Sequence, residues 1–192
     1  MAKKQEFKPD KPSISLLSRM LLTKKQQKTV LKWVFYGLFL VLLSVLQDVL
    51  LSRVRIFRAT TELVPCAIFL ICLIEGSHSG SLFSLIAGLL YLFSGTAPGP
   101  YSMVAIVFIS VGVCILRQAY LQDTFASVAI CVAIAMFTYV LTNFAFGLFL
   151  DLTRFSRLHG FLITAGLSLL TVPVLYPVVK AINAFGGHSW KE

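Results

Sequence analysis

The sequence predicts an all-α integral membrane protein with about six transmembrane helices, and three observations lead to this fold class. Of its 192 residues, 57% are hydrophobic and only 13% are charged, whereas a soluble domain is about one quarter charged. The charges are also segregated, since none falls between positions 104 and 116 or between positions 124 and 150. Finally, long apolar stretches recur along the chain, as helices that cross a bilayer require.

Residues 1–32 form a basic arm that holds nine of the seventeen lysines and arginines. Few aromatic residues are interleaved with these charges, so we expect anionic lipids on the cytoplasmic side as the partner, and no nucleic acid. The first twelve residues are predicted to be disordered. Residues 13–32 have the spacing of a short interfacial helix, with a solvated basic linker as the alternative. No cleavable signal peptide is expected.

A transmembrane domain is predicted over residues 33–183, followed by a short cytoplasmic tail over residues 184–192. Its six apolar stretches cover residues 33–51, 60–74, 77–94, 101–117, 125–150 and 160–182. The second stretch is short for a bilayer, and Pro65 falls in its first turns, where the missing N–H costs little. The last stretch contains Pro173 and Pro177, which we expect to kink the helix.

Small residues recur at every fourth position from the turn before the third stretch into that stretch, namely Gly76, Gly80, Ser84 and Gly88. Positions i and i+4 lie on one face of a helix, so these residues form a groove with almost no side chain to fill it. Small residues allow neighbouring helix backbones to approach closely within a membrane. The stripe is therefore predicted to be a helix-packing seam.

Polar side chains inside the predicted spans are few, and Gln47, Asp48 and Asn143 are our candidates for contact with a partner. Asp48 lies about 22 Å along the helix axis from the start of the first span, at about 1.5 Å per residue. A charge near the outer edge of the hydrocarbon is costly unless it is paired, hydrated or packed inward. The alternative is a carboxylate that reaches the outer surface or meets one of the following arginines. A solute pocket would also need Glu62 and Thr142.

No pattern in the sequence predicts catalysis, a cofactor or a metal centre. Glu75 and His78 have the spacing of half a di-iron motif, but the fold that uses this motif needs a second copy and further glutamates. Nucleophile-elbow, phosphate-loop and zinc-protease motifs do not occur in the sequence. The four cysteines lie in apolar stretches without CxxC spacing, and we expect them to act as small hydrophobes.

The distribution of positive charge predicts that both termini are cytoplasmic. With six crossings, 12 lysines and arginines fall on the side of the N-terminal arm and 5 on the opposite side. Positively charged short loops remain on the cytoplasmic side of a membrane. A re-entrant hairpin in place of the second and third stretches would leave this prediction unchanged.

Several motifs between about residues 46 and 150 carry a family resemblance. They are Pro65 before an apolar run, the pattern GxxxGxxxxxxxGLL from Gly76 to Leu90, the turn Ser94-Gly95, the pair Pro98-Gly99 and a long aromatic-rich fifth stretch with Tyr139 and Phe144. In these features the chain resembles the MreD family of bacterial rod-shape-determining membrane proteins.

The resemblance implies a non-enzymatic scaffold subunit of the bacterial cytoplasmic membrane. Such a subunit would help to position or regulate lateral peptidoglycan synthesis and so maintain cell shape. The partners implied are an MreC-like bitopic protein, the actin-like MreB filament, and the glycosyltransferase and transpeptidase of wall synthesis. The family is also thought to share a compact six-helix bundle with the substrate-binding subunits of energy-coupling-factor vitamin transporters. Such a substrate-binding subunit is the alternative function.

Overall fold

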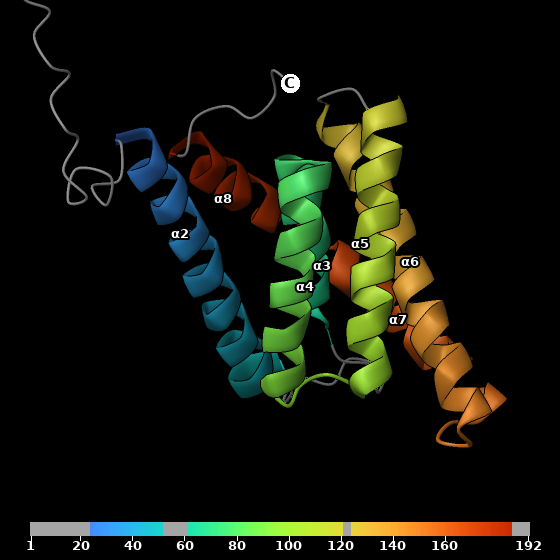
Figure 1. The fold of residues 1–192 in the computed structure, drawn as a ribbon. Coiled ribbons are helices and arrows are strands. Elements are labelled where there is room, and N and C mark those ends of the chain that lie inside the picture. The colour runs from blue at the N-terminus through green and yellow to red at the C-terminus, as the bar shows by residue number, and fades with distance from the viewer. Residues whose placement is uncertain (1–23, 52–60, 121–123, 186–192) are drawn as a thin grey trace, which may run out of the picture.

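The computed structural model describes residues 24–51, 61–120 and 124–185, and over these residues the chain is helical with no strand (Figure 1). The parts of the predicted arm and tail at 1–23 and 186–192 lie outside the described residues. The elements are α2 (Lys24–Leu46), the π-helical turn η1 (Gln47–Leu51), α3 (Leu63–Glu75), α4 (Ser77–Phe93), α5 (Pro100–Tyr120), α6 (Phe125–Phe149), the 3₁₀ turn η2 (Phe155–Arg157), α7 (Leu158–Leu169) and α8 (Val172–Phe185).

Three helices in the described part of the chain are long and apolar enough to cross a membrane. These spans are Gln27–Val49, Pro100–Gln118 and Phe125–Phe149, in α2 with η1, in α5 and in α6. Helices α7 and α8 form a pair bent by 47°, which makes a fourth crossing if the pair is one span. Helices α3 and α4 are apolar but shorter. The described residues thus indicate a helical membrane protein and contain three or four candidate spans by length and composition, and the six-helix bundle stays a prediction.

Helix α3 lies at the centre of the molecule, and all of its residues are buried. It contacts α2, α4, α5, α6, α7 and α8, and Figure 1 shows it behind α4. A helix that is apolar on all sides is either enclosed by protein or in contact with lipid, and α3, with apolar residues from Leu63 to Ile74, is enclosed by protein. Pro65 is its third residue, where an amide N–H would have no partner within the helix.

Helix α2 begins earlier than the sequence predicted. It starts at Lys24 and continues without a break into the first apolar stretch, so residues 24–32 are not a separate interfacial helix. Lysine and glutamine are good helix formers, and no glycine or proline falls between Lys24 and Trp33. The remainder of the predicted interfacial helix, residues 13–23, lies outside the described residues.

The predicted last span is broken into two helices. The break falls between Leu169 and Val172 rather than at either proline, and the two helices are bent by 47°. Pro173 is then the second residue of α8, in the first turn, where proline is tolerated because no helical N–H is lost. Pro177 remains inside α8. The expected kink is present, and it lies on the N-terminal side of both prolines.

The small-residue stripe of α4 faces two different neighbours. A Cβ atom placed on Gly80 would lie 2.8 Å from the backbone oxygen of Cys72, so α4 and α3 are in backbone contact there. A Cβ atom on Gly88 would lie 3.4 Å from the Cγ atom of Met103, which belongs to α5. Ser84, between these glycines, is fully buried.

Gly76 has a different position from the other members of the stripe. It links α3 to α4 and has a φ angle of +95°, a conformation that favours glycine because it has no Cβ atom. A Cβ atom there would also lie 2.9 Å from the guanidinium of Arg117 on α5. Gly76 therefore allows the sharp reversal between α3 and α4 rather than forming part of a helix face.

Candidate functional site: polar clusters at the two ends of α3

Polar side chains gather at both ends of α3 and leave its middle apolar. The lysine–glutamate cluster, at the C-terminal end of α3, consists of Lys32, Tyr36 and Glu75. The tyrosine–glutamate cluster, at the N-terminal end, consists of Gln47, Glu62, Tyr91, Tyr139 and Asn143. Gln47 lies 15 residues after Lys32 in α2 and η1, so the two clusters are about 22 Å apart along that helix at about 1.5 Å per residue.

The lysine–glutamate cluster contains a buried ion pair between α2 and α3. The Nζ atom of Lys32 donates to the Oε2 atom of Glu75 at 2.7 Å, and the two side chains are only 6% and 1% exposed. The Tyr36 hydroxyl is buried next to Glu75. The Lys32 ammonium also lies 5.8 Å from the centre of the Trp33 ring, a cation–π distance. The pair therefore fixes α2 against α3.

This ion pair was not predicted from the sequence. In the sequence, Lys32 belongs to the basic arm, and Glu75 has the spacing of half a di-iron motif together with His78. In the structure, His78 is exposed and Glu75 is buried in its pair with Lys32. The described residues contain no group of three or more His, Cys, Asp and Glu side chains that could hold a metal ion. A glutamate at the end of an apolar stretch requires a partner. This rule predicts that Glu75 is paired, although it does not identify Lys32 as the partner.

At the other end of α3, Gln47 caps the helix from outside. Its Oε1 atom accepts hydrogen bonds from the backbone N–H groups of Leu63 and Val64, at 2.9 and 3.1 Å. The first N–H groups of a helix have no partner within it, and the next residue, Pro65, has none to satisfy. Gln47 lies in the π-helical turn η1, which ends α2 and places this amide over the start of α3.

Glu62 immediately precedes α3 and is held by α7. Its backbone N–H donates to the Oγ atom of Ser168 at 2.9 Å. Its carboxylate atom Oε2 is buried and has no hydrogen-bond partner. Among the described residues no lysine or arginine forms an ion pair with Glu62, in contrast to Glu75 at the opposite end of the helix.

Two buried tyrosines and an asparagine complete the tyrosine–glutamate cluster. Tyr91 of α4 is 1% exposed and Tyr139 of α6 is 0% exposed. The two tyrosines are polar neighbours of each other and of Glu62, and both hydroxyls are buried. The Nδ2 atom of Asn143 donates to the backbone oxygen of Tyr139 at 3.0 Å, which leaves its buried Oδ1 atom without a partner.

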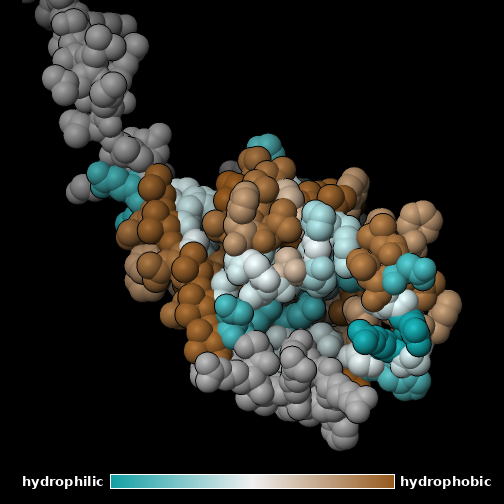
Figure 2. All heavy atoms as spheres, turned by 90° about the horizontal axis from the view of Figure 1, so that it is seen from below, coloured by the Kyte–Doolittle hydropathy of each residue, from teal (hydrophilic) through white to brown (hydrophobic). Residues whose placement is uncertain are grey.

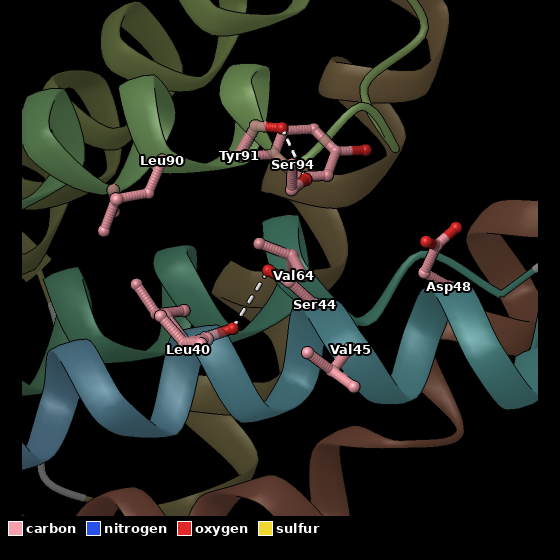
Figure 3. Close-up of a pocket in the computed structure, with 10 residues that line it drawn as sticks. Leu40, Ser44, Val45, Asp48, Val64, Leu90, Tyr91 and Ser94 are labelled. Carbon is pink, nitrogen blue, oxygen red and sulfur yellow. Dashed lines mark hydrogen bonds between the residues drawn. The ribbon is translucent and has the colours of Figure 1, made fainter.

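A pocket of about 240 Å³ lies beside this cluster, between α2, α3 and α4 (Figure 3). Its polar lining residues are Ser44, Asp48, Tyr91 and Ser94, and the others are Leu40, Val41, Val45, Val64, Ala87 and Leu90. Figure 3 shows Asp48 and Ser44 on one side and Tyr91 with Ser94 across from them. Seen from this end of the molecule, hydrophilic side chains gather near the centre, between apolar helix surfaces (Figure 2).

The structure brings together some of the predicted polar residues and separates others. Gln47 and Asn143 both belong to the tyrosine–glutamate cluster, although 96 positions separate them in the sequence. Asp48 is exposed and lines the adjacent pocket. Thr142 is outside the cluster, since its hydroxyl donates to the backbone oxygen of Thr138 at 2.7 Å.

Tyr91 and Tyr139 were missed as site residues by the sequence analysis. Both lie in long apolar stretches, where an aromatic ring is expected in any case. The available signal was the hydroxyl group, because a buried tyrosine normally places its O–H against a hydrogen-bond partner. That two such hydroxyls meet depends on how α4 and α6 pack, which the sequence does not reveal.

Comparison of this chain with protein-family models, with curated proteins and with solved structures finds no match.

Proposed function

We propose that this protein is a non-enzymatic scaffold subunit of a bacterial cell-elongation machinery, similar to members of the MreD family. In this role it binds other membrane proteins and helps to position or regulate lateral peptidoglycan synthesis. The partners that follow from the resemblance are an MreC-like bitopic protein, the MreB filament, and the glycosyltransferase and transpeptidase of wall synthesis. The proposed location is the cytoplasmic membrane, with both termini in the cytoplasm and the basic arm against anionic lipids.

The observation that carries the proposal is the large apolar surface that α2 leaves uncovered. Only 22% of the apolar stretch in α2 is buried, compared with 33% in both α5 and α6. Its exposed residues include Val34, Leu38, Val41, Leu42 and Val45. A scaffold within a membrane needs helix faces that other transmembrane helices can contact. Helix α2 offers such a face, whereas the Lys32–Glu75 ion pair and the hydroxyls of Tyr91 and Tyr139 are buried.

An affinity purification from native membranes in mild detergent tests this proposal, with co-purifying proteins identified by mass spectrometry. We expect a bitopic protein and wall-synthesis enzymes to be enriched relative to a control purification of an unrelated tagged membrane protein of similar size.

A cysteine scan of α2 tests whether its exposed face makes the contact. Disulfide or bifunctional cross-links to the bitopic partner should form from Leu38→Cys or Leu42→Cys, which are exposed, and not from Leu40→Cys, which is buried. Equal cross-linking at all three positions would contradict a role for this face.

The pocket between α2, α3 and α4 favours a second candidate, a substrate-binding subunit of a vitamin transporter. Small-molecule sites are concave and mostly apolar, with a few placed polar groups, and this pocket has those properties over about 240 Å³. The same purification separates the two candidates. A pair of ATPases with a coupling membrane subunit would support the transporter, and a bitopic protein with wall-synthesis enzymes would support the scaffold.

A further inference from the structure

We propose that the loop between α6 and α7 binds the headgroup of a membrane lipid that carries both a phosphate and a primary ammonium group, as phosphatidylethanolamine does. Arg154 and Arg157 bind the phosphate, and Asp151 accepts hydrogen bonds from the ammonium group. This inference concerns the surface of one loop and does not depend on whether the protein acts as a scaffold.

The loop surrounds an open hollow that charged side chains line. The hollow has a volume of about 410 Å³, and its lining residues are Asp151, Leu152, Thr153, Arg154, Ser156 and Arg157. A water molecule occupies about 30 Å³ in the liquid, so the hollow has room for a much larger group. Seen from this end of the molecule, hydrophilic side chains gather at the right of the view, where α6 ends (Figure 2).

The three charged residues of the hollow do not neutralise one another. Among the described residues, no ion pair joins Asp151 to Arg154 or Arg157, although all three line the same hollow. A guanidinium group can bind a phosphate through two parallel hydrogen bonds, and a carboxylate accepts hydrogen bonds from an ammonium group. A headgroup that carries one phosphate and one ammonium group therefore matches the charges that this loop presents.

The loop lies where the headgroups of a bilayer are expected. It follows the candidate span Phe125–Phe149, which has 25 residues. At about 1.5 Å per residue this helix is about 37 Å long, which exceeds the hydrocarbon thickness of about 30 Å. Phe149, Leu152 and Phe155 are 87%, 64% and 73% exposed, and exposed apolar side chains next to basic ones are typical of a membrane contact. These side chains favour a lipid over a soluble phosphate compound as the ligand.

Hydrogen bonds fix the shape of the loop at the end of α6. The backbone oxygen of Gly147 accepts hydrogen bonds from the N–H groups of Leu152 and Thr153, at 2.8 and 3.1 Å. Asp151 has a φ angle of +58°, a left-handed conformation in which aspartate and asparagine are enriched. A loop that is already ordered loses less conformational freedom when a ligand binds.

The test measures lipid binding to the purified full-length protein in detergent by native mass spectrometry. Phosphatidylethanolamine and phosphatidylcholine with identical acyl chains are titrated at one ionic strength. We expect phosphatidylethanolamine to bind about tenfold more tightly, because the quaternary ammonium of phosphatidylcholine has no N–H to donate to Asp151. O-phosphoethanolamine, the same headgroup without acyl chains, should displace the lipid only at about a hundredfold higher concentration, because it has no apolar chain to bury.

Two variants and one control localise the binding. Asp151→Asn removes the carboxylate and suits the left-handed backbone, so the preference for phosphatidylethanolamine should disappear. The double variant Arg154→Gln with Arg157→Gln should weaken the binding of both lipids by about tenfold or more, because the phosphate loses its partners. Lys28→Gln is the matched control, because it removes an exposed positive charge from α2 at the opposite end of the molecule, and it should bind as the wild type does. A circular dichroism spectrum equal to that of the wild type shows that each variant is folded.

Three outcomes would overturn the proposal. The first is equal affinity of the wild type for the two lipids. The second is a preference that persists in Asp151→Asn, or unchanged binding in the double arginine variant, because the site would then lie elsewhere. The third is displacement of the lipid by O-phosphoethanolamine at a comparable concentration, because the ligand would then be a soluble compound and not a lipid.

Discussion

At the scale of single residues, the two glutamates that flank α3 have opposite surroundings. Glu75 is paired with Lys32 at 2.7 Å, whereas no lysine or arginine of the described residues forms an ion pair with Glu62. Truncating one member of a buried ion pair leaves an uncompensated charge, which costs more than the pair itself contributes. Removing one member of the Lys32–Glu75 pair is therefore expected to lower the stability of the protein.

Replacing Lys32 by methionine should destabilise the protein by about 3–5 kcal/mol, because the Glu75 carboxylate would remain buried without its partner. The double variant Lys32→Met with Glu75→Gln should recover most of that loss. Thermal unfolding in detergent measures both effects. Lys28→Met is the control, since Lys28 lies one helical turn earlier and is exposed, and its Tm should stay close to that of the wild type. A Tm for Lys32→Met equal to that of this control would show that the ion pair does not hold α2 against α3.

Gln47 has a role that only an amide or carboxylate oxygen can fill. Gln47→Leu should destabilise the protein by about 1–3 kcal/mol, because the N–H groups of Leu63 and Val64 would lose their acceptor inside the molecule. Gln47→Glu keeps an acceptor oxygen, so it should be less harmful at a pH where the carboxylate is ionised. Gln27→Leu, at an exposed position of the same helix, should leave the unfolding temperature unchanged. Equal stability of Gln47→Leu and Gln27→Leu would refute the capping role.

At the scale of elements, α4 is held by close approach on one side and by side-chain packing on the other. At Gly80 the neighbour is the backbone of α3, which cannot move away without disturbing the central helix. At Gly88 the nearest neighbour is the Cγ atom of a flexible methionine side chain of α5, at an ordinary contact distance of 3.4 Å. Two glycines of one stripe thus tolerate different changes.

Gly80→Ala should destabilise the protein by about 1–3 kcal/mol, because the added methyl group would lie 2.8 Å from the Cys72 oxygen. Gly88→Ala should be neutral or slightly stabilising, since alanine is the better helix former. Gly88→Leu should again be destabilising, because its larger side chain must displace Met103. Unfolding temperatures of the three variants, compared with Gly112→Ala in open space, test this order. Equal tolerance of alanine at positions 80 and 88 would contradict the backbone contact between α3 and α4.

At the scale of the whole molecule, the contacts between helices place the basic residues of different helices at the same end. Lys32 of α2 meets Glu75 at the end of α3, while Gln47 meets the start of α3, so α2 and α3 run in opposite directions. Arg117 of α5 lies beside Gly76 at the lysine–glutamate end. The basic residues of α2 and α5 therefore share one end, and the positive-inside rule predicts that this end is cytoplasmic.

Cysteine labelling in intact cells tests this orientation. Pro98→Cys lies in the exposed turn between α4 and α5, at the end of the tyrosine–glutamate cluster, and Thr124→Cys lies just before α6, at the opposite end. A membrane-impermeant maleimide should label Pro98→Cys in intact cells and label Thr124→Cys only after lysis. The wild-type protein is the control for its own four cysteines. The reverse pattern would invert the topology.

The sequence by itself determined the class of protein and most of the helix boundaries. Hydrophobic runs and segregated charge predict a helical membrane protein, and glycine and proline mark the turns after Glu75 and Phe93. These features are local, because a helix in lipid satisfies its backbone hydrogen bonds within its own segment. Local signals were less reliable near the prolines of the last span, where the bend falls at Leu170 and Thr171 instead.

Only the tertiary structure decided which polar residues meet. The partner of Glu75 is 43 positions away in the sequence, and the tyrosine–glutamate cluster draws on α4, α6 and the segments on either side of residues 52–60. Such contacts depend on the rotation of each helix about its axis. In a chain that is apolar on nearly all faces, hydrophobic periodicity does not specify that rotation. The central position of α3, buried along its whole length, sets those rotations, because each surrounding helix must turn one face toward it.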